Sequence, residues 1–188
     1  MMRLTTLALV LLLSLPTLAD TLTQGMPFPS LRLTDQHDQA VDFDTDRMLI
    51  VFAPDRDSSE IVHPLMNRLE AEGMQQRGIH YIADISSMPG FVTSMFALPK
   101  MRDYPYRIAL GRETEDTAML PRREGQVSLL WVRDGMVEDI RFESDTASLD
   151  AVIETRDRPV FTPQSDPARS PVAGEPGTTP PAAAAPGR

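Results

Sequence analysis

The sequence predicts a three-layer α/β fold, in which a central mixed β-sheet is flanked by helices and preceded by an N-terminal β-hairpin. Three observations support this prediction. The continuous apolar run 48–52 is typical of a strand that is buried on both faces of a sheet. A segment with helical periodicity follows that run. Later in the chain, two strand-like segments flank Asp134-Gly135, a dipeptide that favours a tight hairpin turn.

The first expected elements are a hairpin and a buried strand. Apolar and polar residues alternate in 31–33 and 41–43, on either side of a turn at 35–38, and this pattern predicts the hairpin. The run 48–52 predicts the buried strand, which Pro54 ends.

A helix is expected to follow this strand. Asp57 is the predicted N-cap, and Glu60 lies three positions later as in a capping box. Gly73 is expected to end the helix. The residues predicted to share its buried face are Ile61, Leu65, Met66 and Leu69.

The remaining segments complete the pattern. A strand is predicted at 79–84, and Met88-Pro89 should open a second helix. A short strand at 106–110 and a helix at 113–120 are further candidates. Strands at 127–132 and 137–142 and a helix over 147–153 close the domain. The side chains expected on the buried side of the second helix are Phe91, Val92, Met95 and Phe96.

Both ends of the chain are expected to lie outside the folded domain, which we place at 20–156. Residues 1–19 combine a positive start, an apolar stretch and small residues in Thr17-Leu18-Ala19, the pattern of a signal peptide that is cleaved between Ala19 and Asp20. We therefore expect export to the periplasm. A retained membrane anchor is the alternative, but the apolar stretch is shorter than the ~20 residues that a span needs. Residues 157–188 are rich in Pro and Ala and are expected to be disordered.

Composition excludes several function classes. The net charge of -9 disfavours binding to nucleic acid and to anionic lipid. The absence of cysteine excludes disulfides, thiolate nucleophiles and cysteine-based metal sites. The three histidines lie far apart, so we expect no metal and no cofactor. A copper site at Met88, Met95 and Met101 is an alternative to core packing, which we favour for these methionines.

The order of these elements resembles that of thioredoxin-like proteins, especially the peroxiredoxin-like branch with an insertion before its final hairpin. The segments that carry the resemblance are 25–36, 49–54 and 127–137, and it covers most of 24–154. Segments 83–89 and 120–125 are also similar to exported bacterial proteins of the YtfJ-like kind. Some such proteins are named FAD/FMN-containing dehydrogenases, but this chain has no GxGxxG motif after a strand.

The chain departs from the family at the redox centre. Residues 56–59 are Arg-Asp-Ser-Ser where a thioredoxin carries Cys-x-x-Cys, and a residue near Val127 stands where the family has a cis-proline. A serine hydroxyl neither ionises usefully near neutral pH nor forms a mixed disulfide. We therefore expect no thiol–disulfide or peroxidase activity and assign no catalytic residue.

The same region offers a candidate anion site. A helix N-terminus favours negative charge, and arginines bind carboxylate or phosphate. Simple capping by Asp57 beside solvated arginines is the alternative. The proposed ligand-binding residues are Arg56, Ser58, Ser59, Arg122, Arg123 and Gln126.

The histidines give weaker signals. His80 lies in a predicted strand, where we expect a hydrogen-bonded structural role. Asp57, Ser58 and His63 could form a triad on paper, but adjacent helical positions supply no nucleophile elbow.

Two functions remain open. The first is a binding or interaction module in the periplasm, which takes a small anionic ligand or a protein partner at the face of the lost redox centre. The second is an enzyme of unrecognised chemistry at that face. A deep polar pocket there would favour a ligand or an enzyme, and an apolar patch would favour a protein partner.

Overall fold

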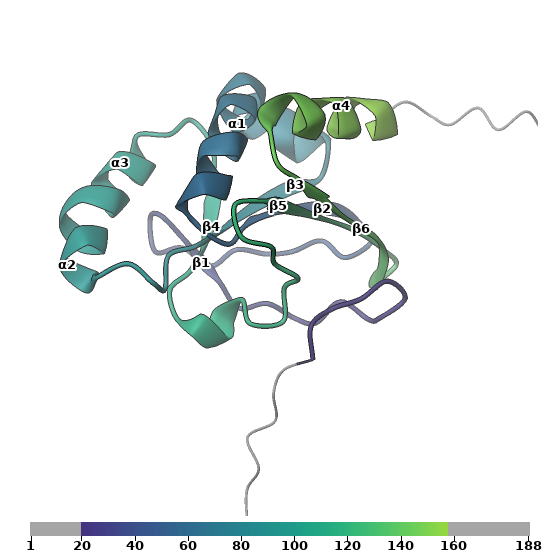
Figure 1. Ribbon diagram of the computed structural model, residues 1–188, viewed down its shortest axis with the longest axis horizontal. Helices are drawn as coiled ribbons and strands as arrows, with labels where there is room; N and C mark the ends of the chain where they lie inside the picture. The colour runs from purple at the N-terminus through teal and green to yellow at the C-terminus, as the bar shows by residue number, and fades with distance from the viewer. Residues whose placement is uncertain (1–19, 158–188) are drawn as a thin grey trace, which may run out of the picture. The chain divides into compact units, whose positions relative to one another are not determined.

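The computed structural model describes residues 20–157, and six strands in it form one mixed sheet of order β1-β4-β3-β2-β5-β6 (Figure 1). The expected signal peptide at 1–19 and tail beyond residue 157 lie outside the described residues, so both stay predictions. Within 20–157, no helix has the length and apolar character that crossing a membrane requires.

The elements follow the predicted order. The strands are β1 (Thr34–Asp35), β2 (Arg47–Ala53), β3 (Ile79–Asp84), β4 (Ile108–Gly111), β5 (Val127–Arg133) and β6 (Met136–Glu143). The helices are α1 (Arg56–Gln76), α2 (Gly90–Val92), the π-helix η1 (Thr93–Ala97), α3 (Leu98–Arg102), the 3-10 turn η2 (Thr114–Asp116) and α4 (Thr146–Asp157).

Three parallel strands end together at one edge of the sheet. Strand β3 pairs in parallel with β2 and β4, so the carboxyl ends of all three strands meet. Ala53 pairs with Ala83, and Asp84 pairs with Gly111. Helix α1 begins directly after β2, at this C-terminal edge. Ligands of open α/β sheets commonly bind at such an edge.

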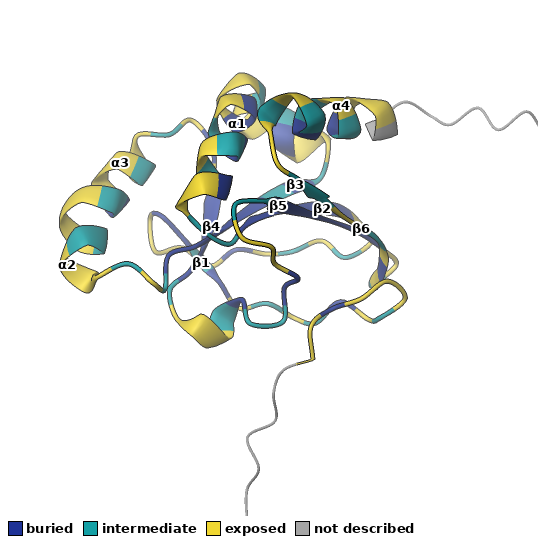
Figure 2. Ribbon diagram, in the orientation of Figure 1, coloured by how far each residue is buried: buried dark blue, intermediate teal, exposed yellow. Residues whose placement is uncertain are grey.

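The sheet is buried on both faces, as the apolar run in β2 predicts. Leu49 and Val51 belong to one hydrophobic cluster, which includes residues of α1 and α4. Ile50 and Phe52 belong to the other, which the N-terminal segment and the loops around Val41 and Leu120 complete. Helices thus cover one face of the sheet, whereas mainly irregular segments form the third layer (Figure 2).

Two turn predictions have different outcomes. The Asp134-Gly135 turn is confirmed, because both residues have positive φ, 50° and 73°, and β5 pairs with β6. The N-terminal hairpin is reduced to an isolated bridge between Thr34 and Ala40, and β1 pairs with β4. Asp35 accounts for this compact turn, since its carboxylate accepts the N–H groups of His37 and Gln39 at 2.8 and 2.9 Å.

The prediction for the second helix is wrong about its buried face. Phe91, Met95 and Phe96 are 65, 67 and 64% exposed. The segment is broken into α2, η1 and α3, and in the π-helix the N–H of Leu98 bonds the carbonyl of Thr93, five positions back. This wider turn changes the period of the face, and Leu98 is the residue that reaches the core.

Two further helix predictions need correction. Helix α1 passes Gly73 and ends at Gln76, although Glu70 within it has the non-helical angles φ 54° and ψ -173°. Segment 113–120 forms only the 3-10 turn η2, because the Asp116 carboxylate accepts the N–H groups of Arg112 and Glu113 and holds a tight turn there.

Candidate functional site

The start of α1 is capped by Asp55, two residues before the predicted cap Asp57. The Asp55 carboxylate accepts the N–H of Ser58 at 2.8 Å, and the Ser58 hydroxyl accepts the N–H of Asp55 at 3.1 Å. These two bonds form a capping box in which serine replaces the usual glutamate. Asp57 and Glu60 are exposed. The predicted helix start is thus confirmed, but its cap lies one half-turn earlier.

Both serines at this helix start hydrogen-bond the backbone of Asp55. The Ser58 side chain is completely buried, and its hydroxyl also donates to the Asp55 carbonyl at 2.8 Å. The Ser59 hydroxyl donates to the same carbonyl at 3.0 Å, and the Ser59 side chain also hydrogen-bonds Tyr81. These hydroxyls hold the first turn of α1 in place.

The loop before β5 lies beside the helix start, as the fold predicts. The N–H of Gly125 donates to the second oxygen of the Asp55 carboxylate at 2.8 Å. Burial alone would raise the pKa of Asp55, but the hydrogen bonds from Ser58 and Gly125 lower it below its ordinary 3.8. Asp55 is therefore charged at neutral pH and ties the loop to α1.

A second carboxylate, at the end of β3, holds the same loop. Asp84 accepts hydrogen bonds from the Thr117 hydroxyl at 2.7 Å and from Arg122 at 3.1 Å. Its other oxygen accepts the N–H and the hydroxyl of Ser86. Burial would raise the pKa of Asp84, yet these donors and the Arg122 charge lower it below 3.8. Arg122 also lies 5.4 Å above the Phe52 ring.

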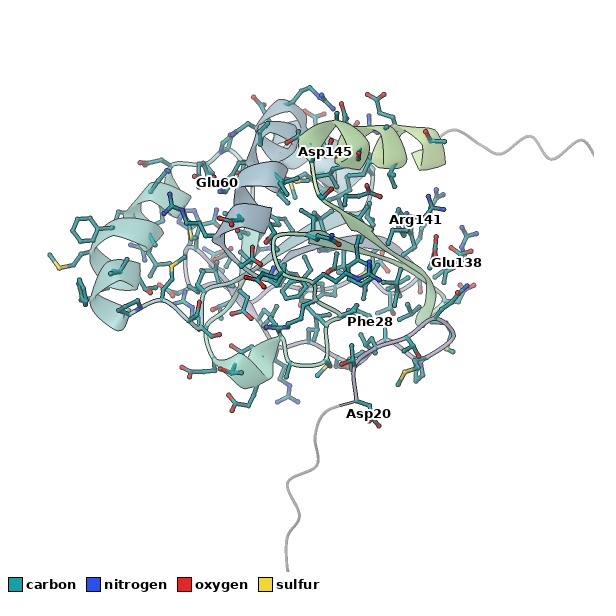
Figure 3. All side chains as sticks on the ribbon, in the orientation of Figure 1. Asp20, Phe28, Glu60, Glu138, Arg141 and Asp145 are labelled. Carbon is teal, nitrogen blue, oxygen red and sulfur yellow. The ribbon has the colours of Figure 1, made fainter. Side chains whose placement is uncertain are left out.

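The three arginines of the candidate anion site have different partners. Arg56 pairs with Glu60 at 3.1 Å, and both side chains are exposed. Glu60 is labelled on α1 in Figure 3. Arg122 is bound to Asp84, and the Arg123 guanidinium stacks 3.9 Å from the centre of the Phe142 ring. The fold brings their backbones to one edge without directing their charges to one point. Binding of an anion by Arg56, Ser58, Ser59, Arg122, Arg123 and Gln126 stays a prediction.

His63 belongs to an aromatic cluster, so the triad considered above does not form. Its Nδ1 lies 2.8 Å from the Tyr106 hydroxyl, and its ring lies 4.9 Å from that of Tyr104. Burial and the nearby Lys100 lower the pKa of His63 below 6.5, so the imidazole is neutral at pH 7. Ser58, in contrast, is hydrogen-bonded to Asp55.

An apolar surface lies on the segment that follows the end of β3. We call Phe91, Met95 and Phe96 the apolar lobe. Spacings of four and five residues place these side chains together on a helix that includes a π turn. The segment 85–102 contains no acidic residue, although the chain as a whole carries a net charge of -9. Figure 2 shows how exposed the α2–α3 segment is.

The metal and methionine predictions can be placed on this structure. Within 20–157, no three His, Asp or Glu side chains gather in a way that could hold a metal ion. Met88 and Met101 pack against the core, as expected, whereas Met95 belongs to the apolar lobe.

Comparison with solved structures identifies the architecture. A thiol:disulfide interchange protein from Bacteroides sp. aligns with a TM-score of 0.50 at 13% identity, over 77% of this chain and 96% of its own. A structure described as a protein disulfide isomerase from Bacteroides thetaiotaomicron gives 0.50 at 12%, over 74 and 91%. The fold is thioredoxin-like. A peroxiredoxin-like protein from Aquifex aeolicus aligns at 0.49 and 14%, over 74 and 89%.

The two alignments with a TM-score of 0.50 establish the thioredoxin-like fold alone. No protein-family model and no curated protein sequence matches the chain. The chain contains no cysteine, so the thiol chemistry in the names of those structures requires side chains that it lacks.

Sequence reasoning missed the Asp84 network and the apolar lobe. Asp84 was predicted only as the end of a strand, and its partners Thr117 and Arg122 lie 33 and 38 residues away. The one usable signal was its position, since a polar residue at the end of a buried parallel strand lies at the edge where sites form. The apolar lobe was missed because apolar residues at helical spacing predict a face that packs against the core.

Proposed function

We propose that this thioredoxin-like chain is a non-enzymatic binding module of the periplasm, which holds a protein partner on the apolar lobe. The observation that carries the proposal is the exposure of Phe91, Met95 and Phe96, each about two-thirds exposed. Large apolar side chains gathered on one exposed segment are typical of protein interaction surfaces. Phenylalanine and methionine are also enriched in the cores of interfaces.

The position of the lobe supports the same function. Its segment leaves the sheet at the C-terminal edge, directly after Asp84 and Ile85. Tyr104, just beyond α3, contacts His63 in the first half of α1. The segment that carries the lobe is therefore attached to the helix whose start holds the redox centre in related folds.

Charge favours a protein over a lipid surface as the occupant. The charged residues of the segment 85–102 are Lys100 and Arg102, and Arg102 is already bonded to the Gln36 carbonyl and to Asp38. One remaining lysine offers little attraction to anionic lipid, and the net charge of -9 opposes it. An apolar surface with an acidic rim would complement the lobe and Lys100.

Site-specific photocrosslinking tests the proposal in the source organism. A crosslinking residue at position 95 should capture one defined partner, whereas the same residue at the exposed position 24 should not. In the variant F91S/F96S, which retains the crosslinker, capture should fall strongly because the partner loses its apolar contacts.

Met136 supplies the matched control, since it is the other large exposed hydrophobic side chain of the described residues, at 42%. Met136→Ser should leave capture unchanged. Equal capture with and without Phe91 and Phe96, or binding of the purified protein to anionic vesicles through the lobe, would overturn the proposal.

A further inference from the structure

A cavity of about 470 Å³ lies at the opposite end of the sheet, away from the lobe and the helix start. This volume is within the range of small-molecule sites, roughly 300–1,000 Å³. Its walls come from the start of β3, the last turns of α1 and the loop before β2. We call it the notch.

The notch arises from an offset between two strands. Strand β3 begins at Ile79, but its pairing with β4 begins only at Tyr81 and Ile108. The sheet therefore has a gap beside Ile79 and His80. Residues from both hydrophobic clusters meet in this gap, with Met74 and Tyr81 from one side of the sheet and Val41 and Ala109 from the other.

A backbone distortion in α1 positions the wall that this helix contributes to the notch. Glu70 has φ 54° and ψ -173°, a region that residues other than glycine rarely occupy. The following N–H, of Ala71, leaves the helical pattern and bonds the Pro105 carbonyl at 3.1 Å. Ala71, Met74 and Gln75 then line the notch. Such a strained residue persists only where its surroundings hold it, and it is commonly found near binding sites.

The polar groups of the notch point to the chemistry of its ligand. His80 packs 5.2 Å from the Phe43 ring, and its ring nitrogens make no hydrogen bond to any residue of the described range, contrary to the expected structural role. Burial lowers the pKa of His80, so the neutral imidazole can accept a hydrogen bond. Asp42 and Asp44 are exposed at the rim.

The balance of charge in the notch is negative. Arg107 is neutralised by Asp35 at 2.7 Å and also donates to the Ala40 carbonyl. The charges that remain are the carboxylates of Asp42 and Asp44 against the single guanidinium of Arg47, whose carbonyl lies against Gly78. An ammonium group fits two carboxylates and an imidazole acceptor.

We infer that the notch binds a small molecule with a protonated amine on an apolar body. The amine lies between Asp42, Asp44 and His80, and the hydrocarbon part packs against Met74, Tyr81 and Ala109. This site is independent of the proposed function, because it uses the opposite edge of the sheet.

NMR titration of the full mature chain tests this inference with 2-phenylethylamine as the probe and 2-phenylethanol as its uncharged control. The amine should saturate and shift the resonances of Met74, His80 and Ala109, and it should bind more tightly than the alcohol. D42N/D44N should weaken amine binding about fivefold, which corresponds to about 1 kcal/mol in total or about 0.5 kcal/mol for each exposed charge pair, and should leave binding of the alcohol unaffected.

Two further variants make the result decisive. Asp46→Asn changes an exposed carboxylate of the same loop outside the notch and should have no effect. Ala71→Phe fills the mouth from an exposed position and should abolish binding of both probes. Amine binding that maps elsewhere, does not saturate, equals that of the alcohol or survives D42N/D44N unchanged would overturn the inference.

Discussion

Replacing Asp55 by alanine should destabilise the protein more than any comparable change in the first turn of α1. The substitution removes two contacts, the cap on the Ser58 N–H and the bond from the Gly125 N–H. Loss of an N-cap costs about 1 kcal/mol. A hydrogen bond to a charged oxygen contributes about 1.5–3 kcal/mol when buried, and about 1 kcal/mol is reasonable for the half-buried Asp55. The expected loss is therefore about 2 kcal/mol.

Urea unfolding at pH 7 measures this difference. With an m-value of about 1.5 kcal/mol/M, the midpoint should fall by about 1.3 M. Asp55→Ser separates the two contacts, because serine is a good N-cap but is too short to hold Gly125, so about half the loss should remain. Asp57→Ala is the matched control, with an expected change below about 0.5 kcal/mol.

Acid supplies an independent check on the same residue. The pKa of Asp55 in the folded state lies below its ordinary 3.8, so its stabilisation is fully present above that value and is lost as the pH falls through the lowered pKa. The difference in the free energy of unfolding between the wild type and Asp55→Asn should therefore become smaller below pH 3.8. Equal effects of Asp55→Ala and Asp57→Ala, or a gap that widens in acid, would refute this account of the helix start.

Three other substitutions follow from the same packing. Asp84→Ala should cost about 2–3 kcal/mol in urea unfolding, because Arg122 and Thr117 lose their acceptor, and strict additivity with Arg122→Ala would contradict the pairing. Gly111→Ala should cost about 1–3 kcal/mol, because its Cβ would lie 2.5 Å from the Thr117 Cγ2. Thr117→Ser should rescue that variant by removing the methyl while keeping the hydroxyl, and a lack of rescue would argue against the clash. Glu70→Gly should stabilise the protein by about 1 kcal/mol by relieving its positive φ, whereas Glu72→Gly, in regular helix, should destabilise it by a similar amount.

The sequence predicted the sheet better than the segments that surround it. The apolar run in β2 and the Asp134-Gly135 turn depend on local chemistry, and both are confirmed. The face of the second helix was predicted with a period of 3.6 residues, which the π-helix changes. The predicted cap lies two residues too late because Asp55 and Asp57 are both good caps, and the contact of Asp55 with Gly125, 70 positions away, is not visible in the local sequence.

In the candidate site, too, the order of elements was predicted correctly, whereas the side-chain contacts were not. The position of the loop before β5 beside the start of α1 followed from the order of elements, and the Asp55–Gly125 bond confirms it, whereas binding of an anion there stays a prediction. The directions of Arg56, Arg122 and Arg123 did not follow, because each depends on a partner that the tertiary structure supplies.

The two outer strands of the sheet limit how another chain can attach to it. Strand β1 has two residues, and β6 carries charged side chains, of which Glu138 and Arg141 are seen in Figure 3. Short or charged borders resist the addition of a foreign strand and hence the growth of fibrils. The register shift in the β5–β6 ladder, between Trp131 and Val132, makes the outer strand β6 less regular and so less suited to pair with a strand of another chain. A binding partner is therefore expected to recognise side chains and not to extend the sheet.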